Sequence, residues 1–134
     1  MIAADTSVVV AAFASWHEGH ESALRVLERR PRLPVHVVAE TYSVLTRLPP
    51  PHRTSFEVAA QFIALRFQNP FLHLSDDGLR STLDTAATSR IGGGAIYDAL
   101  IAATAAEAGA VLVTRDRRAV GVYETLGTQY DLLL

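Results

Sequence analysis

The chain has 134 residues, which is enough for a single domain over residues 1–134 with a substantial buried core. A hydrophobic fraction of 49% and a net charge of −2 exclude a disordered tail and a globally basic nucleic-acid binder. The chain contains no cysteine and no lysine, which excludes disulfides, thiolate zinc sites, Schiff-base lysines and P-loop lysines.

Two further absences concern location. No apolar run reaches the roughly 18 residues of a membrane span, and no basic segment precedes an apolar stretch at the N-terminus. We therefore expect a cytoplasmic protein without a membrane partner.

Apolar runs separated by helix breakers predict alternating strands and helices. In chain order we expect a strand at residues 1–4, helices at 8–14 and 21–29, a strand at 35–37 leading into a helix to about 47, a helix at 55–66, a strand at 71–74, helices at 75–89 and 95–108, a strand at 111–114, a short helix at 117–126 and a last strand at 129–133. This alternation predicts an α/β fold with a parallel sheet covered on both faces.

Four carboxylates stand where apolar segments end or helices begin, and they are Asp5, Glu40, Asp98 and Asp116. Asp5 and Asp116 follow expected strands, while Glu40 and Asp98 lie in helices that enter or leave the same edge. In open parallel sheets, sites gather beyond the carboxyl ends of the strands, so we expect these acids to converge. Acids are costly to desolvate, and a hard divalent cation would compensate them.

Mg²⁺ takes oxygen ligands, usually one or two carboxylates together with waters and substrate phosphate. Asp5 and Asp98 are the first choices as direct ligands, and Asp116 is expected to bind a second ion or the first through water. Glu40 is expected to hold a water, position an ion or act as a base. The hydroxyls of Thr6 and Thr114 are candidates for orienting a carboxylate.

Each acid also has a purely structural interpretation. Asp5 caps a helix, Asp98 is a favourable first-turn charge, and Glu40 can face water on an amphipathic helix. Asp116 lies among arginines, which are Arg115, Arg117 and Arg118. Those arginines can hold substrate phosphates or simply neutralise Asp116. Only the four acids taken together favour one shared site.

The segments around these acids resemble those of a PIN domain, and closely those of the VapC toxins of bacterial VapBC toxin–antitoxin pairs. The matching segments are Ile2 to Ser7, Ala39 to Pro49, Ile96 to Ala105 and Leu112 to Arg118. The resemblance spans the whole chain, and Tyr97-Asp98-Ala99-Leu100-Ile101-Ala102 is its most specific part.

The resemblance implies a three-layer α/β/α sandwich with a parallel sheet of about five strands. It also implies a Mg²⁺- or Mn²⁺-dependent endoribonuclease toxin, acting on tRNA or rRNA, that is neutralised by a VapB-like antitoxin and forms a homodimer within that complex. The family's acidic residues carry over to Asp5, Glu40, Asp98 and Asp116, with Thr114 in support. Arg117, Arg118 and Ala119 stand where some relatives have a fifth polar ligand.

Two other functions remain open at this stage. One is a non-catalytic PIN-fold binding module, although such a scaffold has no need of the four acids. The other is a different metal-dependent phosphohydrolase; a dehalogenase-type enzyme would need an aspartate at position 7, where this chain has Ser7. Trp16 is the best candidate for a partly exposed anchor of a partner helix.

Overall fold

A computed structural model describes residues 1–133. Its elements in chain order are β1 (Ile2–Ala4), α1 (Thr6–Phe13), α2 (His20–Glu28), α3 (Val35–Thr46), α4 (Phe56–Arg66), α5 (Asp76–Thr88), α6 (Ala95–Glu107), β2 (Val111–Thr114), α7 (Val120–Thr125) and β3 (Tyr130–Leu132). All the helices expected from the sequence are present. The last one begins later than expected, at Val120, because residues 117–119 form a turn before it.

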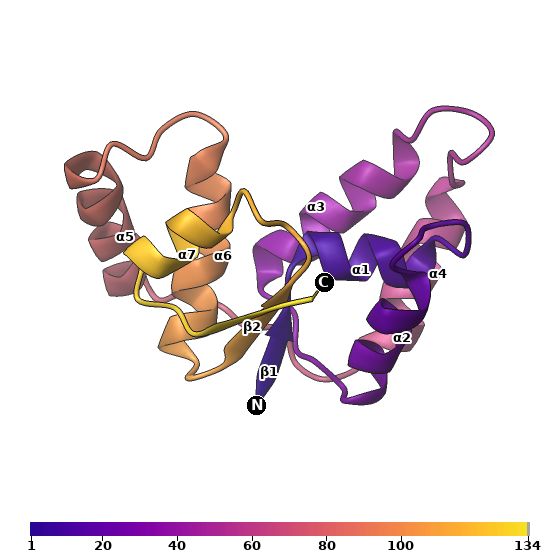
Figure 1. Cartoon of the computed structure of the whole chain (residues 1–134), viewed down its shortest axis with the longest axis horizontal. Coiled ribbons are helices and arrows are strands. Elements are labelled where there is room, and N and C mark those ends of the chain that lie inside the picture. The colour runs from indigo at the N-terminus through magenta and orange to yellow at the C-terminus, as the bar shows by residue number, and fades with distance from the viewer. Residues whose placement is uncertain (134) are drawn as a thin grey trace.

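The strands form a parallel sheet in the order β1-β2-β3. Ile2 pairs with Val111 and Leu112 pairs with Tyr130. The sheet lies between α1 to α4 on one side and α5 to α7 on the other (Figure 1). This arrangement confirms the predicted α/β/α class, and it brings the carboxyl ends of β1 and β2 to one edge.

Two of the five strand predictions are wrong. Residues 35–37 form the first turn of α3, and residues 71–74 make only one isolated bridge, from Leu72 to Pro34. The chain still passes beside β1, where the Arg32 N–H donates to the Ile2 carbonyl at 3.0 Å. Pro31 and Pro34 flank that contact and lack N–H donors, so this segment cannot extend a ladder.

The core fills both spaces between the sheet and the helices. Its largest completely buried apolar side chains include Leu33, Leu45, Ile101, Leu112 and Tyr123. Side-chain caps fix three helix starts, since Asp5, Ser55 and Ser75 each accept a hydrogen bond from a backbone N–H in the first turn. In the described residues, no helix is both long and apolar enough to cross a membrane.

Candidate active site

The four predicted acids come from four different elements. Asp5 directly follows β1 and caps α1, and Asp116 lies just beyond β2. Glu40 is on α3 and Asp98 is in the first turn of α6. Since β1 and β2 are parallel neighbours, Asp5 and Asp116 follow strands that end at the same edge.

The pKa of the Asp98 carboxyl indicates that the four acids lie close together. Partial burial and, in decreasing order, the charges of Glu40, Asp116 and Asp5 together raise the pKa of its carboxyl from 3.8 to about 6. Arg118 lowers it. Three carboxylates therefore act on a fourth, as expected for groups gathered at one edge.

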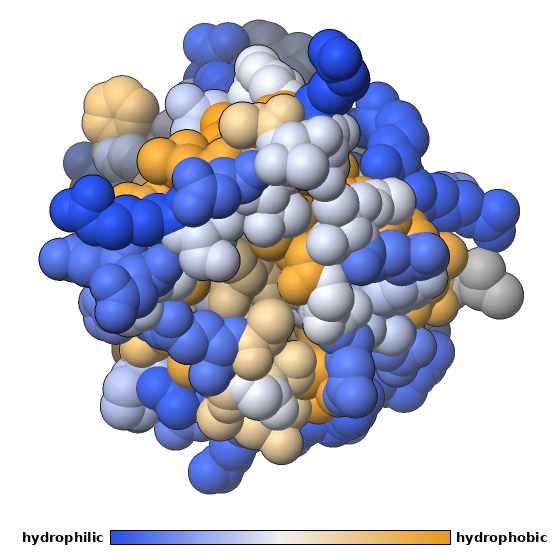
Figure 2. Space-filling view, turned by 90° about the vertical axis from the view of Figure 1, so that its left-hand side faces the viewer, coloured by the Kyte–Doolittle hydropathy of each residue, from blue (hydrophilic) through white to orange (hydrophobic). Residues whose placement is uncertain are grey.

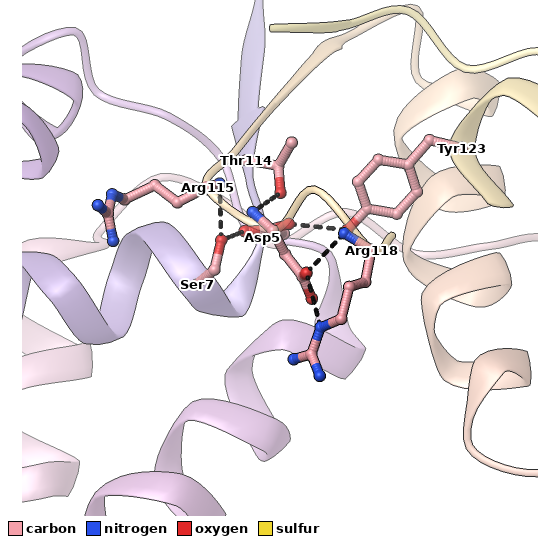
Figure 3. Close-up of polar contacts among 7 residues, drawn as sticks. Asp5, Ser7, Thr114, Arg115, Arg118 and Tyr123 are labelled. Atoms are coloured by element: carbon pink, nitrogen blue, oxygen red, sulfur yellow. Dashed lines mark hydrogen bonds and ion pairs between the residues drawn. The ribbon is translucent and has the colours of Figure 1, made fainter. Parts of the chain in front are cut away.

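Asp5 is the most deeply placed acid, with only 3% of its surface exposed. Burial raises the pKa of its carboxyl, while hydrogen bonds from Ser7, Thr114, Tyr123 and the Val8 amide oppose the rise. The Ser7 hydroxyl donates to Oδ1 at 2.5 Å. The Tyr123 hydroxyl donates to Oδ2 at 2.7 Å. These two donors reach Asp5 from α1 and α7, on opposite sides of it (Figure 3).

Asp116 and Glu40 are more accessible. The Asp116 carboxylate accepts a hydrogen bond from the Arg118 amide at 3.0 Å, and the Arg118 Nε lies 3.5 Å away. The Arg118 side chain is 93% exposed, so this ion pair contributes little to stability. Glu40 Oε2 lies 3.8 Å from the Nε2 of His36, one turn earlier on α3.

The predicted supporting residues differ in their contacts. The Thr114 hydroxyl accepts a hydrogen bond from the Asp116 amide at 3.0 Å, so it fixes the turn that carries this acid. The Thr6 hydroxyl is buried and has no hydrogen-bond partner among residues 1–133. A buried hydroxyl without a partner beside an acid is a position where a bound water or ion would be stabilised.

The three arginines near Asp116 are not equivalent. The Arg115 amide donates to the Ser7 hydroxyl at 2.8 Å, and its side chain points away from Asp5 (Figure 3). Its guanidinium packs so closely on Gly19 that a Cβ at that glycine would lie 2.3 Å from Cζ. Arg117 and Arg118 are exposed, which leaves them accessible to a phosphate.

The donor chemistry at this edge fits a hard divalent cation, since every acid supplies oxygen. Within residues 1–133, no three histidine, aspartate or glutamate side chains already form a complete set of ligands for one ion. Mg²⁺ commonly uses only one or two carboxylates and fills its other positions with water. A metal set of Asp5, Asp98 and Asp116 therefore stays a prediction.

Sequence reasoning missed the buried pair of Tyr123 with Asp5. Tyr123 is 1% exposed, and burial together with the nearby Asp5 and Asp98 charges raises the pKa of its hydroxyl well above the usual range. The tyrosine therefore stays protonated and donates to Asp5. Its spacing from Ala119 marks a buried helix face, but no local pattern points to a partner 118 residues away.

The PIN domain profile matches residues 2–124. The chain belongs to the PIN-domain family. It is 50% identical over 133 residues to "Ribonuclease VapC40" of Mycobacterium tuberculosis, a match that covers 99% of each protein. This confirms the predicted likeness to the VapC group of PIN domains.

Solved structures agree on the fold. The VapC20 toxin of Mycobacterium tuberculosis, described as cleaving the sarcin–ricin loop, aligns with a TM-score of 0.72 and 20% identity over 90% of this chain and 94% of that protein. VapBC2 from Rickettsia felis, bound to a DNA fragment of its promoter, aligns with a TM-score of 0.68 and 17% identity over the whole of both chains. At these identities the structures show the PIN fold itself.

Proposed function

We propose that this VapC-type PIN domain is a Mg²⁺- or Mn²⁺-dependent endoribonuclease, the toxin of a type II toxin–antitoxin system. The observation that carries the proposal is the coupling of Asp98 to the other three carboxylates, which together with burial raise its pKa to about 6. A binding scaffold has no need to maintain such mutual repulsion, whereas a bound divalent cation would relieve it.

Asp5 and Asp98 are the proposed direct ligands, and Asp116 assists through a second ion or through water. When bound, the ion supplies Lewis-acid activation of water and stabilises charge that develops on the phosphate. The Ser7 and Tyr123 hydroxyls hold Asp5 in one orientation, because each takes a different carboxylate oxygen. Such fixed donors reduce the reorganisation that the site needs during reaction.

Glu40 is the proposed residue that positions or deprotonates the attacking water. Its carboxylate is 31% exposed and therefore reachable by solvent. Attack of that water on phosphorus breaks the bond to the 3′ oxygen and leaves a 5′-phosphate and a 3′-hydroxyl. Arg117 and Arg118, both exposed beside Asp116, are proposed to contact neighbouring phosphates.

The proposed substrate is a tRNA or an rRNA in the cytoplasm. The names of two similar proteins support RNA as the substrate class, since the close relative is called a ribonuclease and a structural neighbour is described as cleaving the sarcin–ricin loop. The choice of one RNA depends on the shape and loops of the target rather than on these acids.

The proposed partners are a VapB-like antitoxin and a second copy of the chain. Large apolar side chains remain exposed, as a protein partner would require; Trp16 is 51% exposed and stacks on His52 with ring centroids 4.0 Å apart. On the face that carries α5, apolar side chains lie between charged ones (Figure 2), and Leu79 and Leu83 are 42% and 52% exposed there.

The test uses the purified chain with total tRNA and rRNA, in Mg²⁺, Mn²⁺ or EDTA. We expect cleavage that requires the metal and is lost in Asp5→Asn and Asp98→Asn. The matched control is Asp84→Asn, because Asp84 is an exposed aspartate of α5, a helix that carries none of the four acids. Cleavage that persists in EDTA or in either active-site variant would refute the metal–carboxylate mechanism. A folded protein that cleaves no RNA with any metal would instead favour the binding module.

A further inference from the structure

Two aromatic rings stack beside the four acids. The His36 imidazole of α3 and the Tyr97 phenol of α6 have centroids 4.9 Å apart and planes inclined by only 5°. Tyr97 is 49% exposed, and the His36 side chain is 31% exposed. His36 therefore supports one face of Tyr97 while about half of the tyrosine remains open to solvent.

Each ring of this stack lies close to one of the acids on its own helix. Tyr97 directly precedes Asp98, and His36 lies one turn before Glu40 on the same face of α3. Since His36 Nε2 lies 3.8 Å from Glu40 Oε2 and the Glu40 charge acts on Asp98, the aromatic pair and these two acids are neighbours where α3 meets α6. A nucleotide whose phosphate lies at the acids has its base within reach of the rings.

Packing alone does not account for the pair. An aromatic ring used for the core is normally covered on both faces, as Phe67 is at 5% exposure. An open, rigidly backed aromatic face beside a phosphodiester site is instead the arrangement with which proteins bind unpaired bases, since every base offers a flat face to stack on. Both rings also carry polar atoms that tolerate water when no ligand is bound.

We infer that Tyr97, backed by His36, is a stacking platform for an unpaired nucleobase of the RNA substrate. The inference rests on the proposed ribonuclease function and deepens it, because it restricts the substrate at this position to single-stranded or looped RNA. Stacking accepts any base, so the platform selects RNA by its unpaired state more than by its sequence. Tyr97 contacts the substrate, whereas His36 is a positioning residue that acts through Tyr97.

Binding in EDTA tests the platform separately from cleavage. The probe is a fluorescent single-stranded RNA of about 12 nucleotides that contains 2-aminopurine, whose fluorescence is quenched when it stacks on an aromatic ring. Tyr97→Ala is expected to weaken the affinity between about 5-fold and 100-fold and to abolish the quenching, while Tyr97→Phe retains both. His36→Ala is expected to give a smaller loss. Tyr42→Ala is the matched control, because Tyr42 is an exposed tyrosine of α3 that lines the groove toward α4 instead.

Cleavage kinetics in Mn²⁺ provide the second measurement. For Tyr97→Ala we expect the KM for single-stranded RNA to rise by more than kcat falls, with recovery in Tyr97→Phe. Equal affinity, quenching and KM in Tyr97→Ala and the wild type would overturn the platform, even if the wild type cleaves RNA. If the wild type cleaves no RNA, the proposed function is refuted. Weakened RNA binding by Tyr97→Ala would still support the platform in that case.

A protein–protein role for the same rings gives a different result. If the rings belong to an interface between two copies of the chain, Tyr97→Ala lowers the mass measured by sedimentation while the RNA affinity stays unchanged. That outcome overturns the platform. Far-UV circular dichroism of each variant confirms that the fold is retained.

Discussion

Replacing Asp98 with asparagine should stabilise the metal-free protein at neutral pH while it removes activity. The folded protein binds the Asp98 proton more tightly than the unfolded chain, because the carboxyl pKa is about 6 in the fold and 3.8 without its neighbours. Folding stability therefore falls as the pH rises from about 4 to 6, and stays lowered above that range. Asparagine has nearly the same shape and carries no charge, so it removes this penalty.

The magnitude follows from the size of the pKa shift. A rise from 3.8 to about 6 corresponds to about 3 kcal/mol at full effect. The Asp98 side chain is only partly buried, so we halve this value for solvent screening, to about 1.5 kcal/mol. With a urea m-value of about 2 kcal/mol/M, the unfolding midpoint of Asp98→Asn should rise by about 0.7 M near pH 7.5 in EDTA. Near pH 4.5 the gain should shrink to about a third, because Asp98 is then largely protonated in the fold.

The assay is urea unfolding followed by circular dichroism at both pH values, with Asp84→Asn as the control for losing an exposed carboxylate of α5. The control should show no pH-dependent gain. The reasoning is refuted if the Asp98→Asn midpoint is equal to or below the wild-type value near pH 7.5. An equal gain at both pH values would also refute it, since asparagine would then stabilise the protein by another route.

The remaining predictions concern the neighbours of these carboxyls. Glu40→Gln should lower the pKa of Asp98, because it removes the largest of the raising charges, whereas Arg118→Ala should raise that pKa; ¹³C NMR titration of the Asp98 carboxyl measures both, and shifts in the same direction would contradict the electrostatic account. Tyr123→Phe should destabilise the fold by about 1–3 kcal/mol, because it removes a donor from the buried Asp5 carboxylate; thermal unfolding measures the loss, and an unchanged midpoint would show that this hydrogen bond contributes nothing net.

The order of helices and strands could be read from the sequence with few errors. Asp5, Ser55 and Ser75 stand at helix starts because their side chains bond backbone amides a few residues later, which is a local interaction. The two wrong strands, at residues 35–37 and 71–74, are apolar runs too short to reveal their period. The strand prediction over residues 35–37 was also wrong because the residues after Pro34 belong to α3.

The sequence by itself determined the four acids and the edge of the sheet where they lie, because parallel strands carry their carboxyl ends to one side and each acid is visible in its own segment. Only the tertiary structure decided what surrounds them. The bond from Tyr123 to Asp5 and the stack of His36 on Tyr97 each join residues far apart in the chain. Such contacts depend on how helices pack against one another, which local spacing does not encode. The first opposes the rise in the pKa of Asp5, and the second supports one face of Tyr97.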